Sequence, residues 1–283
     1  MSRRLKIGLA VTVGLVVLGA ASVRLLGLRG IASEAAPYPD PSHAPLDALL
    51  RAHVRDGRVD YVSLKTDARL ERYVATLAGW GPRSTPDAFP SEEARLAYQL
   101  NAYNALVLFA VARAWPIASV HDVRGPIEPK AGFGFFWAQH FRLDGRWINL
   151  YDLEHDVLRA GFEDARIHAA IVCASASCPR LAAAAYRPET VDAQLDLAMR
   201  AFASAPYVRV DDEGERIVLN AIYDWFAEDF AAEARRRAAG QTVLDGVVAF
   251  ADPETRAALT RARRDGYAVT YAAYDWSVNA AGP

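Results

Sequence analysis

Residues 166–181 read RIHAAIVCASASCPRL and hold both cysteines of the chain, Cys173 and Cys178. The run 167–173 is almost continuously apolar, which is the pattern of a central strand covered on both faces. A loop of small residues follows, and Pro179 is typical of the first position of a helix. The stretch therefore predicts a buried strand that delivers a thiol-bearing loop to the start of a short helix.

Cys178 is the candidate nucleophile of this loop. At a helix N-terminus its sulfur would face free backbone N–H groups and the positive end of the helix dipole, and both favour the thiolate. The small residues 174–177 would let backbone amides approach a substrate oxygen, as an oxyanion hole requires. Two other interpretations stay open, a disulfide between Cys173 and Cys178 or two inert thiols in a tight turn.

A cysteine nucleophile needs a base, and no histidine follows residue 168. We select His155, which falls in the first turn of a helix that Asp152 would cap. The helix dipole there disfavours imidazolium and leaves a neutral ring able to take a proton. Asp152 and Glu154 could orient that ring. The alternative is a structural, hydrogen-bonding His155, and His168 is expected at the far end of the strand from the cysteines.

Asn101 and Asn104 lie three positions apart in the apolar helix predicted for residues 91–115, so they share one face. Amides inside an apolar helix must find partners. We expect them to hold the backbone of a buried loop; the sharper alternative is that they line a pocket and stabilise an oxyanion. Near the C-terminus, Asp275 and Asn279 could likewise either line a pocket or anchor the tail to the core. We expect them to anchor the tail.

The remaining pattern predicts an α+β fold, with one globular domain over residues 46–283 and a central, mostly antiparallel sheet flanked by helices. Hairpins are expected at 141–150, turning at Asp144-Gly145, and at 207–218. Helices are expected at 46–54, 67–78, 91–115, from 152 to before Gly161, and at 189–203, 221–239, 241–251 and 253–264.

The first thirty residues differ from the rest. Three basic residues precede an uncharged run, which predicts a short cytoplasmic stub and a single-pass membrane anchor at about 7–28 with its N-terminus inside. A cleaved signal is the alternative, because Ala20-Ala21-Ser22 offers small residues to a peptidase. Residues 31–45 are rich in proline and predict an extended linker. We therefore expect a protein of the bacterial inner membrane whose domain lies in the periplasm, or, after signal cleavage, a secreted or periplasmic protein.

Composition excludes several classes of function. At 283 residues, 52% hydrophobic content and a net charge of −2, the chain offers no basic face, so nucleic acid is not expected as a partner. The spacing C-x4-C is not that of a zinc site, and no H-E-x-x-H, G-x-S-x-G, P-loop or dinucleotide fingerprint occurs. We therefore expect no metal or cofactor, and a small molecule or peptide as the ligand.

Five segments, in order, resemble the family known as domain of unknown function 547 (DUF547): LAYQLNAYNALVLFAV, INLYDLEHDVLR, IHAAIVCASASCPRL, IYDWFAEDF and YAAYDWSVN. The resemblance covers roughly residues 46–279 and implies no particular activity. The chain is similar in this respect to exported bacterial proteins and to plant proteins. The polar positions that it implies are Asn101, Asn104, His155, Cys173, Cys178 and Asp275.

A second, weaker resemblance is to the core of transglutaminase-like and papain-like folds. It is carried by NAYNALVLFAVARAWPIASV and FFWAQHFRLDGRWINLYD. In those folds a helix carries the nucleophilic Cys, and strands carry His and Asp. Here Asn101 and Asn104 occupy the helix, aromatic residues stand where the His is expected, and only Asp152 lies near the acid. The usual triad is absent.

Two functions follow. The first is a non-catalytic binding module of the cell envelope, anchored in the membrane, with Cys173 and Cys178 bridged. The second is a thiol-dependent hydrolase or acyl or amide transferase. In it Cys178 attacks the substrate, His155 takes and returns the proton, and Asn101 or Asn104 stabilises the oxyanion.

Overall fold

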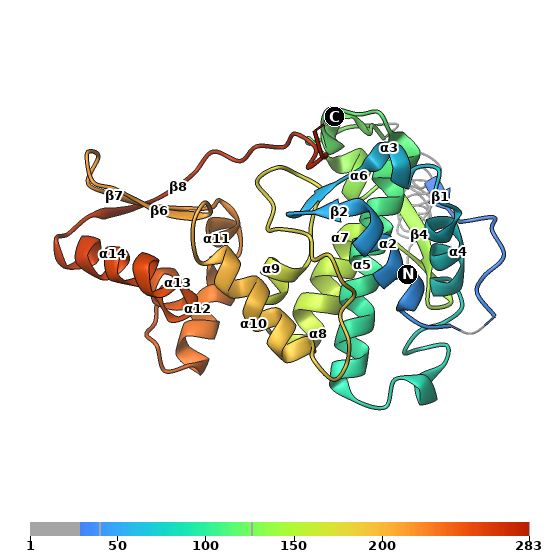
Figure 1. The fold of residues 1–283 in the computed structure, drawn as a ribbon, viewed down its shortest axis with the longest axis horizontal. Helices are drawn as coiled ribbons and strands as arrows, with labels where there is room; N and C mark the ends of the chain where they lie inside the picture. Colours follow the sequence, from blue (N-terminus) through green and yellow to red (C-terminus); the bar gives the residue numbers. More distant parts are fainter. Residues whose placement is uncertain (1–28, 40, 126, 283) are drawn as a thin grey trace, which may run out of the picture.

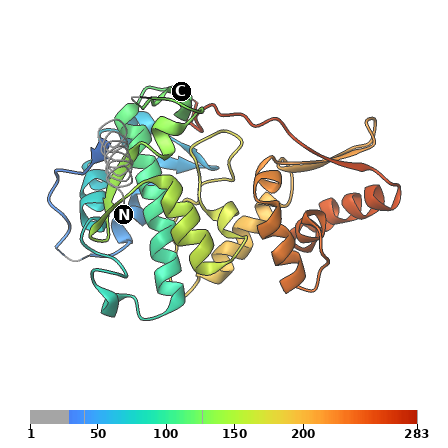
Figure 2. The same ribbon diagram turned by 180° about the vertical axis from the view of Figure 1, so that it is seen from behind.

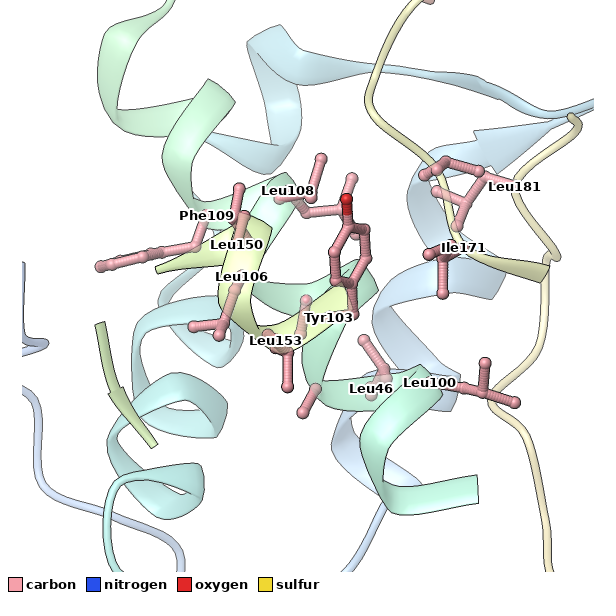
Figure 3. Close-up of a cluster of buried hydrophobic side chains, with 14 of the residues drawn as sticks. Leu46, Leu100, Tyr103, Leu106, Leu108, Phe109, Leu150, Leu153, Ile171 and Leu181 are labelled. Carbon is pink, nitrogen blue, oxygen red and sulfur yellow. The ribbon is translucent and has the colours of Figure 1, made fainter. Parts of the chain in front are cut away.

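A buried helix, α5 (Glu92–Ala114), forms the centre of the larger part of the molecule. The computed structural model describes residues 29–39, 41–125 and 127–282. The side chain of Ser91 caps α5 by accepting a hydrogen bond from the amide of Ala94 at 3.1 Å. Nearly every residue from 94 to 112 is buried, as expected for a helix that is apolar on almost all sides. Figure 3 shows Leu100, Leu106 and Phe109 of this helix packed with Leu46 and Leu153.

Short elements surround α5 and complete the larger lobe, which we define as residues 29–190 together with the tail 272–282. The helices of the lobe are α2 (Ala44–His53), α3 (Tyr61–Leu64), α4 (Ala68–Leu77), η1 (Pro86–Ala88), η2 (Val120–Asp122), α6 (Phe133–Phe136), α7 (Leu150–Asp152), the π-helix η3 (Leu153–Arg159), α8 (Ala160–Phe162) and α9 (Ile167–Ala170). The strands are β1 (Arg29–Ile31), β2 (Val54–Arg55), β3 (Arg58–Val59), β4 (Gln139–Leu143) and β5 (Arg146–Ile148).

The smaller lobe spans residues 204–271 and has its own hydrophobic cluster. It contains β6 (Val208–Asp211), β7 (Arg216–Leu219), β8 (Ala268–Tyr271), α11 (Ile222–Trp225), α12 (Ala227–Arg236), α13 (Val243–Phe250) and α14 (Pro253–Arg264). Helix α10 (Val191–Phe202) joins the lobes, since Leu195 packs in the larger cluster and Met199 in the smaller one. In Figures 1 and 2 the smaller lobe lies to one side, and the chain then returns to the larger lobe.

The α+β class is confirmed, but the expectation of a central sheet is wrong. Strands of the described residues form three small sheets, ordered β1-β4-β5, β2-β3 and β6-β7-β8. Both predicted hairpins are present, as the antiparallel pairs β4–β5 and β6–β7. At the first hairpin, Asp144 and Gly145 have φ of 49° and 76°, the left-handed values that such a two-residue turn requires. The sheets stay small because helices, rather than further strands, cover α5.

The strand expected at 167–173 is also absent. Residues 167–170 form the short helix α9, and the chain beyond it is extended but joins no sheet. In place of a neighbouring strand, the side chain of Asn104 donates to the carbonyl of Ala170 and accepts from the amide of Val172, both at 3.0 Å. An apolar run this short does not distinguish a strand from a buried helix, and here it contains both a helical turn and an extended segment.

Two predicted helix starts need correction. No helix begins at Cys178, because the described chain between α9 and α10 holds only turns and extended segments. The helix expected to start at Asp152 starts earlier, at Leu150, and is capped by the side chain of Asn149, which accepts from the amide of Asp152 at 2.7 Å. The dipole arguments for Cys178 and His155 therefore lose their structural basis.

Within the described ranges, no helix combines the length and the apolar character needed to cross a membrane. The predicted anchor at about 7–28 lies outside those ranges.

Candidate aromatic pocket beside a cysteine pair

Cys173 and Cys178 face each other across a tight loop. Their sulfurs lie at disulfide distance, and their Cα atoms are 6.4 Å apart. The hydroxyl of Tyr274 lies 3.1 Å from each sulfur, and the amide of Cys173 donates to Sγ of Cys178 at 3.0 Å. Burial raises the pKa of Tyr274, so its hydroxyl keeps the proton that it donates. Of the three interpretations of the pair, this geometry favours the disulfide.

The C-terminal tail holds the loop between the cysteines. Ala176 donates its amide to the carbonyl of Ser277 at 2.7 Å, and Ser177 donates its amide to Asp275 at 3.2 Å. The amide of Cys178 turns back to the carbonyl of Ser175 at 3.1 Å. The amides of Ala176 and Ser177 were candidates for an oxyanion hole. Because each is already paired within the chain, they do not face a substrate.

A cavity of about 180 Å³ adjoins the cysteine pair, and we call it the aromatic pocket. Both sulfur-bearing residues line it, together with His155, His168, Glu154 and the apolar Ile171 and Ile222. Its other walls are aromatic rings contributed by several separate segments of both lobes and the tail: Tyr103, Phe136, Trp137, Tyr151, Trp225, Phe226, Tyr274 and Trp276. Such a concave, largely apolar site with a few polar groups is typical of small-molecule binding.

His155 reaches the pocket from the second turn of the helix that starts at Leu150. Its ring stacks on Tyr151 with centroids 3.9 Å apart, and its Nδ1 lies 3.1 Å from the carbonyl oxygen of the same residue. That contact places the proton on Nδ1 and leaves Nε2 as an acceptor. The structure thus brings His155 and Cys178 to one cavity, as the sequence predicted, although by a different local geometry.

His168 is a pocket residue that the sequence analysis missed. Its Nε2 lies 2.7 Å from Oδ2 of Asp229, and its ring stacks on Phe226 at 3.9 Å. Asp229 also accepts two hydrogen bonds from Arg159, at 2.8 and 3.1 Å. Burial raises the pKa of Asp229, but the bonds from His168 and Arg159 outweigh it and hold the pKa well below its usual range. A histidine within an apolar run needs a polar partner, and that signal could have marked it.

Glu154 supplies the one carboxylate among the described residues that line the pocket. Its Oε2 accepts a hydrogen bond from the hydroxyl of Tyr103 at 3.0 Å. Burial, followed by the nearby charge of Glu154, raises the pKa of Tyr103, which keeps that hydroxyl a donor.

The two asparagines hold backbone instead of facing the cavity. Asn101 donates to the carbonyl of Tyr186 at 2.9 Å and accepts from its amide at 2.8 Å. Asn104 likewise donates to the carbonyl of Ala170 and accepts from the amide of Val172. The expectation that they anchor buried loops is confirmed. Neither lines the pocket, and their amide nitrogens are already engaged, so nothing in this arrangement supports the oxyanion role.

The tail is anchored to the core, as expected. Asn279 accepts a hydrogen bond from the hydroxyl of Tyr61 at 2.9 Å and donates to the carbonyl of Gly57 at 3.2 Å. Asp275 accepts from the amide of Ser277 at 2.9 Å. By this route the tail positions Tyr274 and Trp276 against the cysteine pair.

A second, polar cavity of about 570 Å³ shares His155 with the aromatic pocket. Arg159, Arg235 and Arg236 line it beside four carboxylates, so charges of both signs face it. Across the described residues, no group of three or more His, Cys, Asp or Glu side chains gathers as metal ligands would.

Residues 87–203 match the family model described as "Protein of unknown function, DUF547". That segment contains α5, His155 and both cysteines, whereas Trp225, Tyr274 and Asp229 lie beyond it. No curated protein and no solved structure matches the chain, so the likeness to transglutaminase-like and papain-like cores stays a prediction. Over residues 87–203, the chain carries the DUF547 family pattern that its sequence had indicated.

Proposed function

We propose that the protein is a binding module that takes a small organic ligand in the aromatic pocket, with the bridged cysteines as a fixed part of its wall. The observation that carries the proposal is the convergence of aromatic rings from α5, α6, α7, α11 and the tail on one cavity. Aromatic walls bury apolar ligand surface at a low cost in side-chain entropy.

The rings are held in place rather than left mobile. The ring of Tyr274 packs against that of Trp225 in a tilted arrangement with centroids 4.7 Å apart, and its hydroxyl lies 3.1 Å from each of the two sulfurs. Trp276 lies 5.6 Å from Trp225 and 4.4 Å from the ring of His121. A wall assembled before the ligand arrives avoids the entropic cost of ordering it during binding.

Titration with the neutral fluorescent dye N-phenyl-1-naphthylamine tests this proposal. Trp225→Ala should weaken dye binding by about tenfold, the loss expected from one aromatic contact. Trp147→Ala is the matched control, because Trp147 is 49% exposed, Trp225 is 47% exposed, and Trp147 does not line the pocket. Equal weakening by both variants, or none by either, would show that the dye binds elsewhere and would refute the proposal.

A second candidate function is a thiol-dependent hydrolase or transferase. It is favoured by one observation, the presence of Cys178 and of His155, with its free Nε2, in the same cavity. It requires reduction of the pair, so that Cys178 can act as nucleophile and His155 as base. Alkylation followed by intact-mass measurement tests it. Labelling of Cys178 before any reductant is added shows a free thiol in the resting protein and supports the enzyme. Labelling only after reduction rules out Cys178 as a nucleophile of the resting protein.

We also propose that residues 7–28 anchor the protein in a membrane, with the described domain in an oxidising compartment such as the periplasm. Support comes from the basic residues before an uncharged run and from the cysteine pair at disulfide distance. Alkaline carbonate extraction of membranes tests the anchor. Release of a chain whose N-terminus begins after Ala20-Ala21-Ser22 would instead support a cleaved signal.

A further inference from the structure

We propose that the ligand of the aromatic pocket carries an organic ammonium group, held between the carboxylate of Glu154 and the faces of the surrounding rings. This inference rests on the proposed function, because it names the chemical class that the same pocket takes.

The first argument is charge. Of the described residues that line the pocket, Glu154 alone bears a carboxylate, and no Lys or Arg accompanies it. Its one hydrogen bond comes from a neutral hydroxyl, that of Tyr103. In the described part of the chain, Glu154 forms no ion pair, and Arg159, five positions further along the chain, is engaged by Asp229 at 2.8 Å. A ligand cation in the pocket would give this half-buried carboxylate a counter-charge in direct contact.

The second argument is the chemistry of the walls. Aromatic faces carry negative quadrupole density and attract cations within about 6 Å of the ring centroid. Rings from Tyr103, Phe136 and Trp225 enclose the cavity from three different elements, α5, α6 and α11. Several ring faces together with one carboxylate form the arrangement that recognises quaternary and alkyl ammonium groups.

The third argument is a cation–π contact within the protein itself. The ammonium of Lys130, an exposed residue, lies 3.7 Å from the ring centroid of Trp137 and 5.9 Å from that of Tyr151. These two wall rings, which stack on each other at 4.5 Å, therefore already attract a primary ammonium at the border of the pocket. An anionic ligand, by contrast, would meet Glu154 without a lining cation to offset it.

The test compares choline with 3,3-dimethylbutan-1-ol, a neutral molecule of nearly the same shape in which carbon replaces the charged nitrogen. The readout is tryptophan fluorescence, since Trp137, Trp225 and Trp276 line the pocket. We expect choline to bind about tenfold more tightly than the alcohol. Glu154→Gln should remove most of that preference, whereas Glu213→Gln, an exposed hairpin residue with the same charge change, should preserve it.

The outcomes separate the two proposals. Equal or tighter binding of the alcohol overturns the ammonium inference and leaves the pocket as a binding site for neutral ligands. A preference for choline that survives Glu154→Gln overturns the assignment to Glu154. If neither compound changes the fluorescence or displaces N-phenyl-1-naphthylamine, the ammonium inference fails, and the dye titration of the Trp225 and Trp147 variants alone decides the proposed function.

Discussion

Asn104 accepts a hydrogen bond from the backbone amide of Val172 at 3.0 Å, across 68 positions of sequence. The same side chain donates to the carbonyl of Ala170 at 3.0 Å. One amide thus satisfies two backbone groups that a neighbouring strand would otherwise have to satisfy. It fixes the segment that enters the aromatic pocket at Ile171 and reaches Cys173, so helix α5 positions the pocket without lining it through this residue.

Replacing Asn104 should therefore destabilise the fold strongly. In Asn104→Ala the buried amide of Val172 loses its partner, and the carbonyl of Ala170 keeps only the hydroxyl of Tyr186 at 3.3 Å. We expect a loss of about 2 kcal/mol in the free energy of unfolding, measured by urea denaturation. Gln99→Leu in the same helix is the control, because the buried Oε1 of Gln99 has no hydrogen-bond partner among the residues that the structure describes. This change should be neutral or stabilising. If Asn104→Ala lowers the free energy of unfolding by no more than the control changes it, the two hydrogen bonds of Asn104 do not have the proposed stabilising role.

The cysteine pair should behave as a bridge in the protein purified without reductant. Intact-mass measurement after denaturation with excess iodoacetamide should show no added mass, and prior reduction should allow two additions. The double variant Cys173→Ser, Cys178→Ser should lose about 2 kcal/mol of stability, because the bridge closes a loop with a sequence separation of only 5. Immediate double labelling without reductant would contradict the bridge.

The pair His168–Asp229 should make stability depend on acid pH. Asp229 has a depressed pKa, because bonds from His168 and Arg159 outweigh the effect of burial. Its ionised form therefore stabilises the fold at pH values above the usual pKa of 3.8, and that contribution is lost as the pH falls below it. Asp229→Asn should cost about 2 kcal/mol at pH 7. The difference from the unchanged protein should shrink below pH 4 in a pH series of urea melts. A difference that stays constant down to pH 2 would refute the linkage.

The ammonium of Lys130, 3.7 Å from the ring of Trp137, should compete electrostatically with a cationic ligand in the adjoining pocket. Lys130→Gln should therefore raise the affinity for choline about threefold, because the competing ammonium is removed. Lys65→Gln is the control, with the same change of charge on a lysine that bonds to the carbonyl of Trp115 at 2.6 Å. A weaker affinity for choline in Lys130→Gln would point to a role for Lys130 in ligand binding and would argue against a cation.

Elements governed by neighbouring residues were the ones that local patterns predicted well. The extent of α5, its apolar run and the Asp144-Gly145 turn each depend on contacts within a few positions. The predicted helix at 221–239 illustrates the limit, since it divides into α11 and α12 at Phe226, which has a non-helical φ of −120°. Phe226 is also a wall of the pocket, so packing outweighed helix propensity there.

The pocket was predicted in part. His155, Cys173 and Cys178 were expected to share a site, and they line one cavity. His168 was missed because its segment was interpreted as a strand that carried the histidine away from the cysteines. Its partner Asp229 is 61 positions distant, and no periodicity connects two such residues.

Local sequence patterns were enough to predict the α+β class, the long buried helix and both hairpins. They also showed that two closely spaced cysteines could form a disulfide. Only tertiary packing decided that no large sheet forms, that Asn104 replaces a strand partner, and that Tyr274 meets the sulfurs about 100 positions after them. The reason is that hydrogen bonds within a helix or hairpin depend on near neighbours. A buried polar group, by contrast, takes whichever partner the folded chain brings within reach.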